Sequence, residues 1–262
     1  MLISMLFVPG DRPERFDRAV ASGAGAAIID LEDAVQPDDK SAARANIAAW
    51  LQQGGRAVVR INAIDTPWHA DDITLLDNPG IIAVMLPMVE NAAALRAFIA
   101  ALPSPLPVIA LIETARGLWD LGDLVAVKGV TRLGFGSIDF QLDTGIEDQG
   151  QGLLHARSRI VLASAMAGLE PPLDGVSVDL DDMSGLERDT AHARGLGFGG
   201  KLCIHPRQID VVNRGFAPSP EELDWARRVL DAAKGAKGAI RLEGKLIDAP
   251  VVTRARRLLA TS

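Results

Sequence analysis

The sequence has a single cysteine, no long apolar run and no excess of basic residues, and each absence excludes a class of protein. Cys203 has no partner within the chain, which excludes an internal disulfide and agrees with a reducing cytoplasm. No apolar stretch reaches the roughly 18 residues that a membrane span needs, and the start of the chain has neither a basic segment nor a small-residue cleavage site. We therefore expect a cytoplasmic protein that has no membrane partner.

The charge is acidic, at −7, and it is spread along the chain rather than gathered in a tail. No basic stripe with interleaved aromatic residues is present, which disfavours nucleic acid as a partner. The four histidines show no metal-ligand spacing such as HxxxH, so a zinc hydrolase is disfavoured as well.

Short apolar runs alternate with longer amphipathic stretches as far as about residue 215, which is typical of a parallel sheet covered by helices. The predicted strands are 3–8, 26–31, 57–61, 81–86, 107–112, 131–135, 175–178 and 201–204. The predicted helices lie near 13–21, 39–53, 68–77, 90–101, 115–126, 152–167, 182–194 and 206–214. Eight strand-helix units in one run favour closure into a (β/α)8 TIM barrel, because an open sheet usually stops earlier and leaves edges to protect.

The chain continues beyond the eighth unit with a helix at about 219–234, a hairpin around Glu243 and Gly244, and a last helix from about 249. We therefore expect an α/β fold in two parts. The barrel occupies residues 1–217, and a helical and hairpin extension occupies residues 218–262. The extension is expected to pack on the barrel or on a neighbouring subunit.

Polar residues follow the predicted strands at their C-terminal ends, where TIM barrels carry their catalytic groups. They include Asp30, Glu32, Asp33, Arg60, Asn62, Glu90, Glu113, Ser137, Asp139, Asp179 and His205. Each one alone could cap a helix in a structural role. Their shared location at one end of the barrel is what indicates a site.

Glu113 and Asp139 follow neighbouring strands and are the predicted metal ligands. Two carboxylates without His or Cys suit a hard cation that keeps several waters, so Mg²⁺ is favoured over Zn²⁺. Glu32 and Asp33 would orient metal-bound water, or else cap the following helix.

Arg60 ends an apolar strand, so its charge needs an anionic partner there. It could pair with the neighbouring carboxylates, or it could bind a substrate oxygen in bidentate fashion. We favour the substrate-binding role. Gly136 and Ser137 could bring backbone N–H groups to an oxyanion pocket, and a tight structural turn is the alternative.

These motifs resemble the citrate lyase β-subunit group of the HpcH/HpaI aldolase superfamily, which includes citryl-, citramalyl- and malyl-CoA lyases. The resemblance runs in order along the whole chain. The matching segments are LFVPGDRPERF (6–16), IIDLEDAVQPDDKSAAR (28–44), VVRIN (58–62), VMLPMVEN (84–91), ALIETARGL (110–118), GFGSIDFQLDTG (134–145), GFGGKLCIHPRQI (197–209) and KLIDAPVVTRARRLL (245–259).

The resemblance implies a Mg²⁺-dependent carbon-carbon lyase that cleaves a 3-hydroxyacyl-CoA thioester into acetyl-CoA and a 2-oxo acid. It implies that Glu113 and Asp139 hold the metal, and that Arg60 stabilises the enolate and oxo-acid oxygens. Asp248 is similar to the family's acid/base aspartate, which in related lyases reaches a neighbouring subunit. A homotrimer or hexamer is therefore expected.

The resemblance also suggests residues that contact CoA, and this sequence differs from the family's usual residues in two places. Arg12, Lys40 and Arg44 match basic positions that could meet CoA phosphates, with a solvated helix face as the alternative. Met88 stands where the family commonly has Lys. Gly199 and Leu202 replace bulkier or more polar residues, so the identity of the substrate stays open.

Three other functions compete with a CoA lyase. One is a thioester-binding subunit of a citrate-lyase-like complex, working on an acyl carrier protein. A second is an acyl-CoA thioester hydrolase with the same metal and enolate machinery. The third is a Schiff-base aldolase, which is disfavoured because Lys201 lies near the start of its strand.

Overall fold

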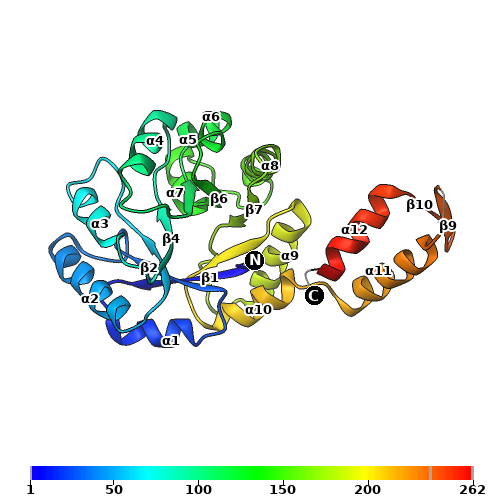
Figure 1. The fold of residues 1–262 in the computed structure, drawn as a ribbon, viewed down its shortest axis with the longest axis horizontal. Coiled ribbons are helices and arrows are strands. Elements are labelled where there is room, and N and C mark those ends of the chain that lie inside the picture. The colour runs from blue at the N-terminus through cyan, green and yellow to red at the C-terminus, as the bar shows by residue number, and fades with distance from the viewer. Residues whose placement is uncertain (1, 236–237, 261–262) are drawn as a thin grey trace. The chain divides into compact units, whose positions relative to one another are not determined.

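The computed structural model describes residues 2–235 and 238–260, which form two compact units, Met1–Asn213 and Arg214–Ser262. In the first unit, eight parallel strands close into a barrel in the order β1 to β8, and helices surround them (Figure 1). The strands are β1 (Ser4–Pro9), β2 (Ala26–Asp30), β3 (Ala57–Arg60), β4 (Ile81–Leu86), β5 (Val108–Ile112), β6 (Val130–Phe135), β7 (Glu170–Asp174) and β8 (Gly200–Cys203). The predicted (β/α)8 barrel is therefore confirmed.

The helices of this unit follow the strands in alternation. They are η1 (Pro13–Arg15), α1 (Phe16–Val20), η2 (Pro37–Asp39), α2 (Lys40–Gln52), α3 (His69–Leu75), α4 (Ala92–Ala101), α5 (Ala115–Trp119), α6 (Leu121–Val125), α7 (Ser137–Thr144), α8 (Gln151–Met166), α9 (Met183–Leu196) and α10 (Arg207–Phe216). The single helix predicted at 115–126 is two helices that meet at Asp120. Helix α7 was not predicted, because its short sequence reads as part of a glycine-containing turn.

The barrel interior is filled by apolar side chains that point inward from alternate strand positions. They form one buried cluster, made of Met5, Ala26, Ile28, Val58, Ala83, Met85, Ile109, Leu111, Leu173 and Leu202. Met5 on β1 lies opposite Leu202 on β8, and this pairing closes the barrel. The closed wall leaves the C-terminal ends of the strands as the rim on which a site can form.

The position of β7 differs from the prediction, which placed this strand at 175–178. The strand is Glu170–Asp174 and contains two prolines, Pro171 and Pro172, which cannot donate to the strand ladder. Their carbonyls are nevertheless used, because Arg132 Nε donates to Pro171 O at 2.7 Å and Gly199 N donates to Pro172 O at 2.9 Å. The residues predicted as the strand instead form the loop that leaves it.

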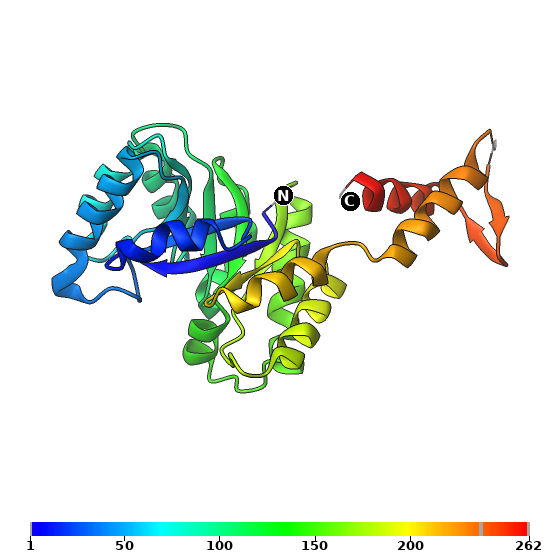
Figure 2. The same ribbon diagram turned by 90° about the horizontal axis from the view of Figure 1, so that it is seen from below.

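The second unit consists of α11 (Pro220–Ala233), the antiparallel hairpin β9 (Ile240–Leu242) and β10 (Lys245–Ile247), and α12 (Ala249–Ala260), drawn in orange and red in Figure 2. Glu243 and Gly244 form the hairpin turn with positive φ angles of 51° and 78°. The small core of this unit contains Ala226, Val229, Ile247 and Ala255. The division between the units falls inside α10, slightly before the expected boundary after residue 217.

No helix within the described residues is both long enough and apolar enough to cross a membrane.

Candidate active site

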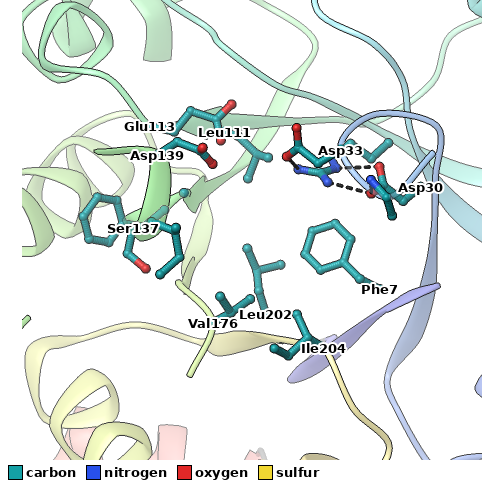
Figure 3. A pocket seen from close by; sticks show the side chains of 15 residues that line it. Phe7, Asp30, Asp33, Leu111, Glu113, Ser137, Asp139, Val176, Leu202 and Ile204 are labelled. Atoms are coloured by element: carbon teal, nitrogen blue, oxygen red, sulfur yellow. Dashed lines mark hydrogen bonds and ion pairs between the residues drawn. The ribbon is translucent and has the colours of Figure 1, made fainter. Parts of the chain in front are cut away.

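The C-terminal ends of the barrel strands surround a cavity of about 340 Å³ (Figure 3). Its lining consists of Phe7, Asp30, Asp33, Ala34, Arg60, Leu111, Glu113, Phe135, Gly136, Ser137, Ile138, Asp139, Val176, Leu202 and Ile204. Seven of the residues predicted for the site therefore lie on one cavity: Asp30, Asp33, Arg60, Glu113, Gly136, Ser137 and Asp139.

Arg60 stands at the end of β3, buried to 8% exposure and surrounded by carboxylates. Its Nε and Nη2 donate to the two oxygens of Asp30 at 2.7 and 2.6 Å, and its Nη1 lies 2.8 Å from Glu32 and 3.3 Å from Asp33. Its guanidinium also lies over the ring of Phe7, 4.7 Å from the centroid. Burial lowers the pKa of Arg60, but the carboxylates outweigh burial and raise it, so the guanidinium stays charged.

Glu113 follows β5 and is 3% exposed. The backbone N–H of Met88 donates to its Oε1 at 2.6 Å, and Met88 itself has a left-handed φ of 51°. A Cβ at Gly136 would collide with the Glu113 carboxylate, so the absence of a side chain there lets the carboxylate lie against the turn before α7. Burial raises the pKa of Glu113 to about 7, against the lowering effect of the Met88 hydrogen bond.

Two more carboxylates near the cavity have raised pKa values. Burial raises the pKa of Glu32 to about 9 despite the nearby Arg60, and burial together with the charge of Asp33 raises the pKa of Asp139. The charge of Asp139 in turn contributes to the raised pKa of Glu113. Figure 3 shows Glu113 and Asp139 side by side on one wall of the cavity. The site therefore holds more negative charge than Arg60 compensates.

This excess of oxygen ligands fits a divalent cation, which would remove the repulsion between Glu113 and Asp139. Among the described residues, no group of three His, Cys, Asp or Glu side chains is arranged to hold a metal ion. A cation held by Glu113 and Asp139 would thus keep most of its coordination positions for water or ligand oxygens. That ligand set suits Mg²⁺.

The first turn of α7 lies on the same cavity. Gly136 occupies the N-cap position and provides no side-chain cap, so the first N–H groups of this helix have no acceptor within it. Ser137 is buried at 5% exposure on the cavity wall. The positive end of α7 therefore faces the place where a ligand carboxylate or oxyanion would lie.

The three basic residues predicted to contact CoA differ in their surroundings. Lys40 is buried, and its Nζ donates to Leu31 O, Glu32 O and Asn62 Oδ1, each at 2.7 Å. Arg44 pairs with Asp71 and Asp72, each at 3.0 Å.

These contacts hold the loop after β2 and the start of α3. The three donors of the Lys40 ammonium are all used in them, whereas a contact between Arg44 and CoA stays a prediction. Arg12 is exposed after β1, with an ion pair of 3.8 Å to Asp11.

Several other predicted polar residues serve local structure. Asn62 donates from its backbone and side chain to Asp72 at 2.9 and 2.6 Å. Asp179 Oδ1 accepts from the backbone N–H groups of residues 181 and 182. His205 Nδ1 accepts from Arg207 N at 3.1 Å.

Lys201 is buried, with its Nζ bonded to Gly175 O and 3.5 Å from Asp174. This ammonium contacts the wall between β7 and β8 and does not line the cavity.

Asp248 belongs to the second unit, where its Oδ1 accepts from Val251 N at 3.3 Å at the start of α12. It is half-buried.

Sequence reasoning missed the backbone N–H of Met88 and the apolar half of the cavity. The apolar half is made of Phe7, Leu111, Phe135, Val176, Leu202 and Ile204, among others. The alternation of inward positions at the strand ends was the available signal for these side chains.

The comparisons with known proteins agree with this geometry. Residues 3–206 match the family model HpcH/HpaI aldolase/citrate lyase. A citrate lyase subunit beta-like protein of Mycobacterium tuberculosis is 39% identical, over 97% of this chain and 93% of the relative. A (3S)-malyl-CoA thioesterase of Cereibacter sphaeroides is 33% identical, over 98% of this chain and 93% of the relative.

A solved structure adds a ligand set on the same fold. It is the protein CitE from Mycobacterium tuberculosis in complex with magnesium, acetoacetate and coenzyme A, with a TM-score of 0.86 and 38% identity. The match covers 99% of this chain and 97% of that protein. By the family model, by whole-length relatives and by fold, this chain belongs to the HpcH/HpaI aldolase/citrate lyase family.

Proposed function

We propose that this protein is a Mg²⁺-dependent carbon-carbon lyase that cleaves a 3-hydroxyacyl thioester of CoA into acetyl-CoA and a 2-oxo acid. The observation that carries the proposal is the pairing of Glu113 and Asp139 on one cavity with Arg60 and the N-terminus of α7. The CitE structure with magnesium, acetoacetate and coenzyme A supports it, because that relative holds a metal, an oxo acid and CoA together.

The cleavage needs a base, an electron sink and a proton donor. The base takes the proton of the 3-hydroxyl group, the bond between C2 and C3 breaks, and the C3–O bond becomes the carbonyl of the 2-oxo acid. The electron pair of the broken bond moves into the thioester as an enolate, and a proton delivered to C2 then gives acetyl-CoA. Mg²⁺ held by Glu113 and Asp139 would supply positive charge to the oxo-acid oxygens.

Within this scheme, Arg60 adds positive charge beside the developing enolate, and the carboxylates around it fix its orientation. The first N–H groups of α7, beginning at Ser137, point to the carboxylate of the oxo acid, whereas the N–H of Gly136 donates to Ile112 O. Glu32 and Asp33, which contact Arg60, orient bound water. Asp248 acts as the acid/base group from the extension of a neighbouring subunit in a homo-oligomer, a trimer or a hexamer.

The first test follows acetyl-CoA release from citryl-, citramalyl- and malyl-CoA, with and without Mg²⁺. Asp248→Asn is expected to abolish release while keeping the oxygen that caps α12, and the matched control Asp231→Asn changes an exposed aspartate of the same unit. Mixing Asp248→Asn with Glu113→Gln should restore activity if the two residues of one site come from different subunits. A mixture that stays inactive, although the oligomer exchanges subunits, would contradict that arrangement.

A thioester hydrolase is the second candidate, favoured by the relative named (3S)-malyl-CoA thioesterase. A thiol assay separates the two reactions, because hydrolysis releases free CoA whereas lysis leaves the thioester of acetyl-CoA intact. The third candidate is a thioester-binding subunit that works on an acyl carrier protein, and turnover of free CoA thioesters by the isolated chain would exclude it.

A further inference from the structure

The cavity is divided into a charged half and an apolar half. Figure 3 shows Glu113, Asp139, Asp33 and Asp30 along one side, and Phe7, Val176, Leu202 and Ile204 along the other. A ligand anchored at the carboxylate side therefore places its far end against hydrocarbon.

Positive charge for a second ligand carboxylate is missing from the described cavity lining. Arg60 is the one cation among these lining residues. Two of its nitrogens are taken by Asp30, and the third lies within 3.3 Å of both Glu32 and Asp33. Because this guanidinium is already paired with carboxylates, and its remaining positive charge serves the enolate in the proposed reaction, the described lining residues of this chain offer no further cation for a second ligand carboxylate.

The apolar half would place the far end of a 2-oxo acid against side chains that offer no hydrogen bond. Val176 is half-buried, Leu202 is 3% exposed and Ile204 is 40% exposed. An unpaired carboxylate loses part of its hydration there without compensation, whereas an alkyl group is removed from water favourably.

We infer that this site selects 2-oxo acids, and the matching 3-hydroxyacyl thioesters, whose variable group is an uncharged alkyl chain, and that it discriminates against the dicarboxylic counterparts. The inference rests on the proposed function and makes it more specific. Val176 and Ile204, on the loops after β7 and β8, are the specificity-determining residues. A cavity of about 340 Å³ has room for alkyl groups larger than methyl.

Related proteins bind 2-oxo acids of both kinds. CitE of Mycobacterium tuberculosis has been crystallised with pyruvate, and the citrate lyase β subunit of that organism with oxaloacetate. The sharpest pair of probes is 2-oxobutyrate and oxaloacetate, which differ by a methyl group in place of a carboxylate. Calorimetric titration of the full-length protein at saturating Mg²⁺ is expected to show at least about tenfold tighter binding of 2-oxobutyrate. This ratio corresponds to about 1.4 kcal/mol.

A variant can introduce the missing cation. Ile204→Arg is expected to shift the ratio at least about tenfold toward oxaloacetate, because it pairs the second carboxylate. Ile204→Gln, which is polar but neutral, should leave the order of preference unchanged. Val176→Lys provides a second cationic variant on a different loop, in case the first fails to fold.

Failure of this inference is distinguishable from failure of the proposed function. Equal or tighter binding of oxaloacetate by the wild type would overturn the inference even if acetyl-CoA is released from a thioester. Conversely, the wild type could bind 2-oxobutyrate selectively and yet form no carbon-carbon bond between acetyl-CoA and a 2-oxo acid. That result would support the alkyl-selective site and contradict the proposed lyase activity.

Discussion

Arg60 and Asp30 form a two-point ion pair across the ends of β3 and β2, with both nitrogen-oxygen distances below 2.8 Å and both side chains largely buried. The strands are neighbours in the barrel, and Asp30 pairs directly with Arg60 in their register. The pair therefore fixes Arg60, the one cation among the described lining residues, relative to the barrel wall.

The first prediction concerns this pair. Asp30→Asn is expected to lower the free energy of unfolding by about 1.5–3 kcal/mol, because it replaces a charged two-point partner of Arg60 with a neutral one while Glu32 and Asp33 stay in place. The matched control is Asp71→Asn, which removes an exposed partner of Arg44 and should cost less than about 1 kcal/mol. Urea unfolding of both variants measures the difference, and equal losses would contradict the prediction.

The second prediction concerns the backbone of Met88. Its N–H orients Glu113, and its φ of 51° is unavailable to proline. Met88→Pro should weaken Mg²⁺ binding by at least about tenfold, because a hydrogen bond to a proposed metal ligand is lost. Met88→Gly keeps the N–H and tolerates the positive φ, so its Mg²⁺ affinity should match that of the wild type. Mg²⁺ titration calorimetry tests the pair.

The third prediction links stability to pH through Glu113. The folded protein holds the Glu113 proton up to about pH 7, whereas the unfolded chain releases it near 4.5, so the group's contribution to the free energy of unfolding falls as pH rises through this window. Glu113→Gln should therefore raise the Tm of the metal-free protein, and the gain should be larger at pH 8 than at pH 5.

Mg²⁺ should make the wild type more stable than Glu113→Gln at pH 8. Saturating Mg²⁺ is expected to stabilise the wild type at pH 8 and to leave Glu113→Gln nearly unchanged. Melting curves at both pH values, with and without the ion, measure the effect. A Glu113→Gln variant stabilised by Mg²⁺ as strongly as the wild type would show that the ion binds elsewhere.

The fourth prediction separates Lys40 from Arg12. Lys40→Met removes the donor to three oxygens, two of them in buried hydrogen bonds, and should lower the free energy of unfolding by about 3 kcal/mol. Arg12→Met, at an exposed position, should leave stability within about 0.5 kcal/mol and raise the KM for the thioester if Arg12 contacts CoA. A stable Lys40→Met protein whose only defect is a raised KM would contradict the structural role of Lys40.

The sequence predicts the barrel and the charged half of the cavity because both depend on local order along the chain. Residues such as Glu113 follow a strand directly, and the C-terminal ends of parallel strands meet at one rim, so their convergence follows from the strand count. The environment of Lys40 could not be predicted in this way. Its position on α2 reads as a solvated face, and only the path of the loop after β2 brings carbonyls over its ammonium group.

The apolar half of the cavity and β7 show a second limit. Val176 was predicted as part of a strand, whereas it lies in the loop after β7 and lines the cavity. The error arose because Pro171 and Pro172 have no backbone N–H to donate to a neighbouring strand, so their sequence does not predict a strand. In the protein the strand is retained by long-range partners, notably the guanidinium of Arg132, which a local pattern does not contain.

The two prolines of β7 leave this strand with few ladder hydrogen bonds. Of the eight strands, β7 has only two paired positions with β6 and two with β8 in the described residues, and it is held to β6 by a side chain as well as by the ladder. Hydrogen exchange should therefore be fastest for the wall amides beside this seam, such as Gly199, and slowest on β2 and β3. The loop that carries Val176 leaves from this seam, so local opening of the seam is expected to displace a residue of the cavity lining as well.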